Sequence, residues 1–158
     1  MFSQNLEIYQ EWVSSLPEII QWLAIFVLGM IPYIEVQAGS VTGILSGINP
    51  ILSILLAMLG NFTIVMLCIL LAEKLNNKFG KEKEELSAKR QKFNRNFDKY
   101  GVIGTSMLGW LILPSSIIGF LMVITAKVPK KKAMLWMTVS ILFWGLIVGI
   151  VFSVINIL

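Results

Sequence analysis

Apolar residues fill four long blocks of the chain, and charged residues separate these blocks at only two places. The blocks run from about residue 19 to 48, from 51 to 72, from 100 to 126 and from 133 to 158. The second and fourth blocks are long enough to cross a bilayer, since a spanning helix takes about 20 apolar residues. The pattern predicts an all-α integral membrane protein with transmembrane helices over 51–72 and 133–156.

The positions of the basic residues predict how these blocks are oriented. All thirteen Lys and Arg residues lie in two links, 73–99 and 127–132. Basic links next to apolar segments are typically cytoplasmic. The block 100–126 would then begin and end on the same side, although two full crossings need about 40 residues. We therefore expect it to enter the membrane and return as a re-entrant helical hairpin, broken near Pro114.

The first half of the chain repeats this pattern in the opposite orientation. Residues 17–49 are also too few for two crossings, and Pro32 lies near their middle. The N-terminal segment carries acids and no base, so we expect the N-terminus outside. Pro32 precedes Ile51 by the same interval by which Pro114 precedes Ala133. Each half is thus predicted to be a hairpin followed by a transmembrane helix, which makes an inverted repeat of the kind found in many secondary transporters.

In this scheme the chain forms a single membrane domain, 1–158. The first repeat covers 17–72 and the second covers 100–158. The cytoplasmic basic link 73–99 joins them, and we expect the basic links to meet anionic lipid head groups.

The N-terminal segment 1–16 places apolar side chains at helical spacing between polar ones. This spacing fits a short amphipathic helix at the membrane surface, and a frayed terminus is the other interpretation. Ser15 and Glu18 flank Pro17 in the pattern of a capping box, so a helix is expected to begin there. Trp22 follows at the position of an interfacial aromatic residue.

Composition agrees with this class of protein. Hydrophobic residues make up 56% of the chain, and its mean hydropathy is +0.79. The chain has no histidine and a single cysteine, Cys68, which excludes a Cys/His metal site, and no cofactor is expected. It also lacks a phosphate-binding glycine loop and a nucleophile elbow. We therefore expect neither an enzyme nor a nucleic-acid-binding protein.

Glu35 is the only charged residue between Gln21 and Leu71. An ionisable side chain at membrane depth is costly and is, by default, functional. Burial also disfavours the charged form of a carboxyl group, so Glu35 is a candidate carrier of a proton or another coupling ion. Two other interpretations stay open: Glu35 could cap the returning half-helix, or it could lie in water at the interface.

Other polar residues are candidates for substrate binding. Gln37 and Asn61 could line a site or make an interhelical hydrogen bond. Ser115 and Ser116 open the second returning half-helix, where free backbone N–H groups favour an anion, and ordinary helix capping is the alternative. The residues assigned to the hairpin breaks are Pro32, Gly39, Gly43 and Pro114, of which the two glycines would also allow close helix packing.

Four short runs, Ile31–Gly39, Leu59–Asn61, Lys99–Gly101 and Leu113–Ser116, resemble the small multidrug export protein family, which is similar to the wider DedA/VTT membrane superfamily. The resemblance extends from about residue 16 to 152. It implies membrane-embedded hairpins with packed helices, a homodimer and a place in the bacterial inner (plasma) membrane. Members of the superfamily are linked to proton-dependent physiology and to translocation of lipid carriers such as undecaprenyl phosphate. Many members carry an arginine two positions after the acid, where this chain has Gln37.

These observations lead to three functional hypotheses. The leading one is a proton- or ion-coupled transporter or flippase for an amphiphilic, undecaprenyl-phosphate-like substrate. In it Glu35 titrates with the driving ion, and Gln37, Asn61, Ser115 and Ser116 bind the substrate. The second is an exporter of hydrophobic cations, for which a buried carboxylate is the natural counter-charge. The third is a non-transporting scaffold or lipid-binding protein.

Overall fold

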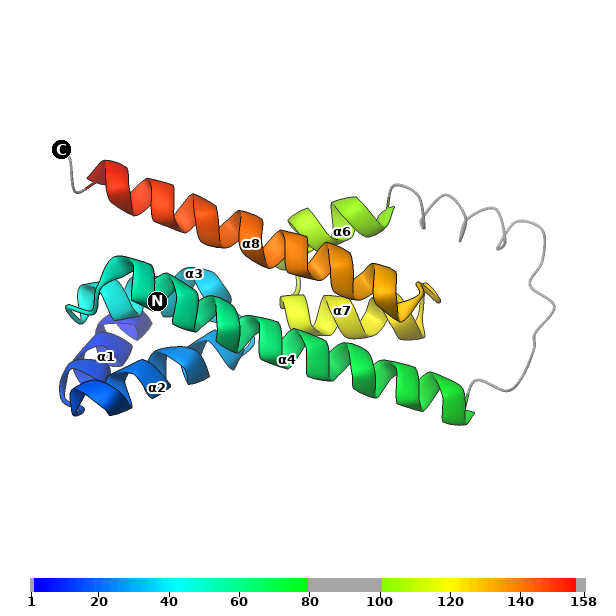
Figure 1. Cartoon of the computed structure of the whole chain (residues 1–158), viewed down its shortest axis with the longest axis horizontal. Helices are drawn as coiled ribbons and strands as arrows, with labels where there is room; N and C mark the ends of the chain where they lie inside the picture. Colours follow the sequence, from blue (N-terminus) through cyan, green and yellow to red (C-terminus); the bar gives the residue numbers. More distant parts are fainter. Residues whose placement is uncertain (1, 80–100, 156–158) are drawn as a thin grey trace. The chain divides into compact units, whose positions relative to one another are not determined.

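The computed structural model describes residues 2–79 and 101–155, and the regular elements within these ranges are all helices (Figure 1). This confirms the predicted all-α class for the described part of the chain. In order, the elements are α1 (Phe2–Ser14), α2 (Glu18–Met30), α3 (Glu35–Leu45), α4 (Pro50–Phe79), α6 (Val102–Leu108), the 3-10 helix η2 (Gly109–Leu111), α7 (Ser115–Ile124) and α8 (Lys130–Ile155).

Two helices are long and apolar enough to span a membrane, α4 and α8. They contain 30 and 26 residues, which corresponds to lengths of roughly 45 and 39 Å against a hydrocarbon core of about 30 Å. Only 28% of the most apolar window of each helix is buried within the protein. A core helix of a water-soluble protein would be covered over most of its surface, so the low burial favours a lipid environment.

Both long helices extend beyond the predicted transmembrane segments. Helix α4 continues to Phe79, seven residues past the predicted end, and α8 begins at Lys130 instead of residue 133. The charged residues at these ends continue the helix because their side chains can reach water. Lys78 also lies in the last turn of α4, where a positive charge complements the helix dipole. The rest of the basic link, residues 80–99, lies outside the described residues.

The remaining helices are short. The two prolines at which we predicted hairpin breaks, Pro32 and Pro114, lie at interruptions between them. Helices α2 and α3 are separated by residues 31–34, which include Pro32, and α7 begins directly after Pro114. With 13, 11 and 10 residues, α2, α3 and α7 measure roughly 20, 16 and 15 Å. None of them is long enough to cross the hydrocarbon core alone.

The N-terminal segment is helical from Phe2 to Ser14, so the frayed-terminus interpretation is wrong for these residues. The predicted capping box is not formed. Ser15 Oγ donates to the carbonyl oxygen of Trp12 at 2.7 Å, because the hydroxyl completes the end of α1. The N-cap residue of α2 is Pro17, whose carbonyl oxygen accepts the backbone N–H of Ile20 at 2.8 Å.

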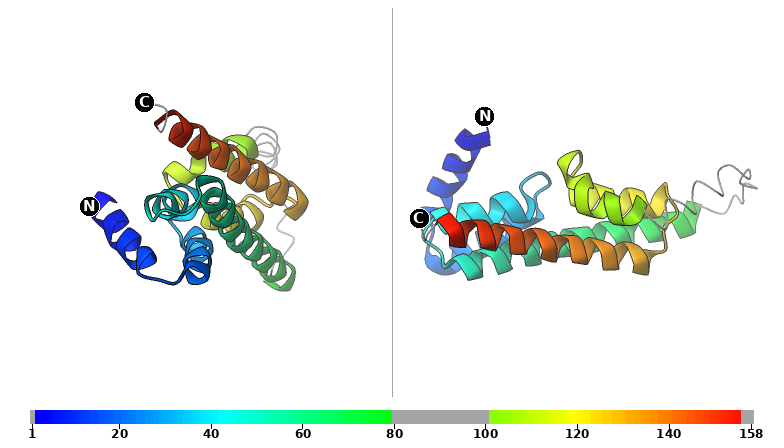
Figure 2. Two further views of the ribbon diagram at one scale, coloured as in Figure 1. Left: turned by 60° about the vertical axis from the view of Figure 1, so that its left-hand side comes forward. Right: turned by 90° about the horizontal axis from the view of Figure 1, so that it is seen from above.

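The chain divides into two compact units, Met1–Thr63 with Ile141–Leu158, and Ile64–Ser140. The first unit contains α1, α2 and α3, which Figure 2 shows as successive short helices, together with the N-terminal part of α4 and the C-terminal part of α8. Its core joins Val13 of α1, Ile25 and Leu28 of α2, Ala38 of α3 and Ala57 of α4, all of which are buried.

Small residues let three helices of the first unit approach one another at backbone distance. A Cβ atom on Gly29 of α2 would collide with the carbonyl oxygen of Ala57 in α4. In the same way, a Cβ atom on Gly60 of α4 would collide with the carbonyl oxygen of Phe26 in α2. Gly39 of α3 completes the contact, because its Cβ position lies 3.3 Å from the methyl group of Ala57. Larger side chains would force these helices apart.

Gly39 and Gly43 lie inside the continuous helix α3, so their assignment to the hairpin break was wrong. They form a small-xxx-small pair on α3 that faces another such pair, Ser53 and Ala57, on α4. A Cβ atom on Gly43 would lie 2.7 Å from Ser53 Oγ. These two glycines therefore serve helix packing.

The second unit holds α6, η2 and α7 with the C-terminal part of α4 and the N-terminal part of α8. Ser140 Oγ of α8 donates to the carbonyl oxygen of Ser106 in α6 at 2.6 Å. Lys130 Nζ at the start of α8 pairs with Glu73 Oε2 of α4 at 2.6 Å. Gly119 allows α7 to pack closely on α4, since its Cβ position lies 3.1 Å from an Ile69 side chain.

The break between α2 and α3 has an unfavourable backbone conformation. Tyr33 and Glu35 have φ angles of 72° and 50°, in the left-handed region that side chains disfavour by about 1–2 kcal/mol per residue. The N–H groups of Ile34 and Glu35 both donate to the carbonyl oxygen of Ile31 at 3.2 Å. Ile34 is buried in the core while Tyr33 is 72% exposed, so packing around Ile34 holds the turn in this conformation.

A substitution at Gly60 tests the close helix contact. We expect Gly60→Ala to lower the free energy of unfolding by about 1–3 kcal/mol, because the added methyl group meets backbone and not a movable side chain. Gly104→Ala is the matched control, since nothing lies within 4 Å of its Cβ position. Thermal unfolding of the purified variants in detergent measures the difference. Equal stability of the two variants would contradict the contact.

A pair of substitutions at Tyr33 tests the strained turn. Tyr33→Gly should keep the stability or raise it by up to about 1 kcal/mol, because glycine adopts a positive φ freely. Tyr33→Val should lower the stability, since a β-branched side chain is least tolerated there. Loss of the exposed tyrosine side chain is common to both variants, and their melting temperatures can be compared directly. A lower melting temperature for Gly than for Val would show that the turn is not strained.

Candidate functional site

Glu35 is the first residue of α3 and follows the break directly. Only 6% of the residue is exposed, so the interpretation that places its carboxylate in water is not supported. The N-cap position of α3 belongs to Ile34, which makes no side-chain capping hydrogen bond. The structure thus places a carboxylate inside the first unit, at the point where the helical hairpin turns.

Other polar side chains are buried in the same unit, on α3 and α4. Asn61 is 2% exposed and follows Gly60, the residue in backbone contact with α2. Gln37 lies one helical turn before the fully buried Ser40 and is itself half-buried. Glu35, Gln37 and Asn61 therefore belong to one compact unit, in which Glu35 and Asn61 are buried and Gln37 is half-buried.

Three buried hydroxyl groups of this unit have no hydrogen-bond partner among the described residues: Ser40 Oγ, Thr42 Oγ1 and Ser53 Oγ. A buried hydroxyl without a partner costs about 1–3 kcal/mol, so such positions attract water or a polar ligand group. Sequence reasoning did not single out Ser53. Its spacing of four residues from Ala57, within the apolar run 51–60, is the signal that could have found it.

Ser115 and Ser116 begin α7 in the second unit and are 7% and 4% exposed. The N-cap residue of this helix is Pro114, which makes no side-chain hydrogen bond and whose carbonyl oxygen accepts the N–H of Ile118 at 3.0 Å. Neither serine therefore occupies the N-cap position. Their predicted role in binding an anionic group stays a prediction, as does their joint action with the residues of the first unit.

The comparisons with known proteins agree with the resemblance in part. The family model described as "Putative small multi-drug export protein" matches residues 35–147, which begin at Glu35 and end within α8. No curated protein and no solved structure shows significant similarity to the chain. The similarity to the DedA/VTT superfamily stays a prediction. An export family and two apolar helices of spanning length together support a membrane protein with a role in transport. The match covers most of the length of this chain, and the chain therefore belongs to the small multi-drug export protein family.

Proposed function

We propose that this protein is an ion-coupled membrane transporter that exports an amphiphilic molecule, with Glu35 as the residue that binds the coupling ion. The proposal rests on one observation: Glu35 lies at a helix break and is only 6% exposed, in a protein of an export family. An acid in such an environment is rarely retained for stability alone, because its burial is costly. Binding and release of a proton or another cation would change its charge and so the local energy of the hairpin.

The proposed membrane placement follows from helix lengths. Helices α4 and α8 would cross the bilayer, while α2–α3 and α6–α7 would enter and return as re-entrant hairpins. Irregular backbone at membrane depth needs cover by protein or contact with a wet cavity, and the close packing of α2 and α3 on α4 supplies such cover for the first hairpin. We place the basic links on the cytoplasmic side of the plasma membrane, the N-terminus outside, and a homodimer as the working assembly.

Gln37, Asn61, Ser115 and Ser116 are proposed to contact the substrate. The two serines open α7, whose backbone N–H groups suit a lipid phosphate such as undecaprenyl phosphate. Substrate contact by Gln37 and Asn61 fits the partial burial of Gln37 and the burial of Asn61 in the same unit as Glu35. A phosphate-bearing amphiphile is therefore the first candidate substrate.

A specific observation favours hydrophobic cations as the second candidate. The first unit contains four acids, Glu7, Glu11, Glu18 and Glu35, and its sequence contains no Lys or Arg. A cationic substrate would therefore find negative charge, and no basic side chain, within the sequence of this unit. The buried carboxylate of Glu35 would be its counter-charge.

Transport by purified protein in liposomes tests the role of Glu35. Glu35→Gln, which removes the charge and keeps the size, should abolish pH-dependent transport, with a rate at least tenfold below that of the unaltered protein. Glu35→Asp should restore part of it. The matched control is Glu11→Gln, which makes the same charge change at an exposed position of α1 and should transport normally. Full pH-dependent transport by Glu35→Gln would exclude the carboxylate from the mechanism.

Competition distinguishes the two substrates. If lipid phosphates are carried, a short-chain polyprenyl phosphate should reduce transport of a labelled substrate while tetraphenylphosphonium should not, and cation export predicts the reverse. A third result, in which the unaltered protein transports neither and cysteines at 33–37 and 114–117 never react with aqueous thiol reagents, would support the non-transporting scaffold.

A further inference from the structure

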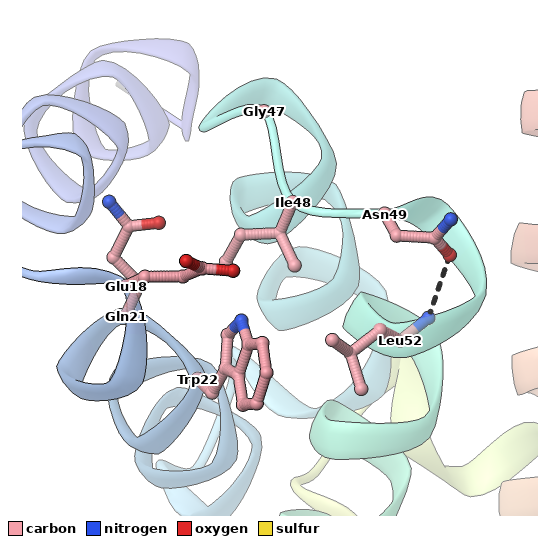
Figure 3. Close-up of a pocket in the computed structure, with 7 residues that line it drawn as sticks. All are labelled: Glu18, Gln21, Trp22, Gly47, Ile48, Asn49 and Leu52. Atoms are coloured by element: carbon pink, nitrogen blue, oxygen red, sulfur yellow. Dashed lines mark hydrogen bonds between the residues drawn. The ribbon is translucent and has the colours of Figure 1, made fainter.

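A pocket of about 430 Å³ opens in the first unit, where α2 begins and the α3–α4 connection ends (Figure 3). None of the predicted site residues lines it. Its volume lies within the range of small-molecule sites, about 300–1,000 Å³. The lining residues are Glu18, Gln21, Trp22, Gly47, Ile48, Asn49 and Leu52.

The walls of the pocket combine one charged group with an apolar surface. Figure 3 shows the Glu18 carboxylate on the same side of the pocket as the indole ring of Trp22, with Leu52 opposite. Trp22 is 38% exposed, so part of its ring is open to a ligand. Ile48 and Leu52 add aliphatic surface.

The two amide side chains of the pocket already make structural hydrogen bonds. Gln21 Nε2 donates to the carbonyl oxygen of Leu16 at 2.8 Å. Asn49 Oδ1 accepts the backbone N–H groups of Ile51 at 3.0 Å and Leu52 at 3.3 Å, and so caps α4. Glu18 is therefore the group that gives the pocket its electrostatic character.

Glu18 is exposed to solvent, and the first unit offers it no basic partner. None of the lining residues is basic, and the sequence of this unit contains no Lys or Arg. A carboxylate next to an open aromatic face is a combination that recognises an ammonium group, by ion pairing with the acid and by cation–π attraction to the ring. The aliphatic wall would contact the carbon substituents of such a cation.

We propose that this pocket binds the ammonium group of an organic cation, with Glu18 as its ion-pair partner and Trp22 as its aromatic contact. The site is separate from Glu35, and it does not depend on the proposed transport function because it is tested by equilibrium binding.

The probe is benzyltrimethylammonium, titrated calorimetrically into the full-length protein in maltoside micelles, which contain no ammonium group. We expect saturable binding that Glu18→Gln weakens about tenfold and Trp22→Leu weakens at least threefold. The matched controls are Glu11→Gln and Trp12→Leu, which make the same changes at exposed positions of α1 that do not line the pocket. Both should bind as the unaltered protein does.

Three results would overturn the proposal. One is an absence of saturable binding by the folded, unaltered protein. Another is equal weakening by the Glu11 and Glu18 substitutions, which would show a general surface attraction. The third is equal competition by neopentylbenzene, the uncharged isostere, which would show a merely apolar crevice. Melting temperatures of the variants identify any loss of binding that comes from unfolding.

A further competition experiment identifies the natural source of the ammonium group. Dihexanoyl phosphatidylcholine should displace the probe if the site takes a lipid head group, while dihexanoyl phosphatidylglycerol at the same concentration should not. Failure of both lipids to compete, with binding of the probe intact, assigns the site to a free organic cation.

Discussion

The first unit depends on one constraint, the approach of α2, α3 and α4 to backbone distance. Gly29 and Gly60 leave no room for a Cβ atom against the facing carbonyl oxygens, and Gly39 lies against Ala57 between them. Packing of this kind stabilises helices by van der Waals contact where the hydrophobic effect is weak, as it is in lipid. It also fixes where the two short helices must separate and turn.

That turn explains the environment of Glu35. Once α2 and α3 both lie against α4, the connection between them has only residues 31–34, and Tyr33 and Glu35 adopt positive φ angles to close it. The carboxylate at the start of α3 is buried as a result, in a unit with no basic side chain. Independently of this turn, many apolar side chains of α4 and α8 are exposed. Burial of the acid and exposure of the apolar surface both fit a membrane transporter.

The sequence predicted the helical class, the two long apolar helices and the interruptions at Pro32 and Pro114, because long apolar runs and prolines act locally. It did not predict the extension of α4 to Phe79, since charged residues allow a helix to continue into water. The unpartnered hydroxyl of Ser53 and the pocket lined by Glu18 and Trp22 were not predicted, for another reason. Both arise from segments distant in sequence that meet only in the fold, as residues 18–22 and 47–52 do.

The central claim is that α2 and α3 enter the membrane together without crossing it. The most direct test is to determine on which side of the membrane the two ends of this first hairpin lie. Ser15→Cys and Ser46→Cys, each in a Cys68→Ala background, place isosteric thiols before α2 and after α3. A membrane-impermeant maleimide should label both from the same side of oriented vesicles, and Lys127→Cys, in the second basic link, only from the other. Labelling of residues 15 and 46 from opposite sides would contradict a re-entrant hairpin and the burial of Glu35 within it.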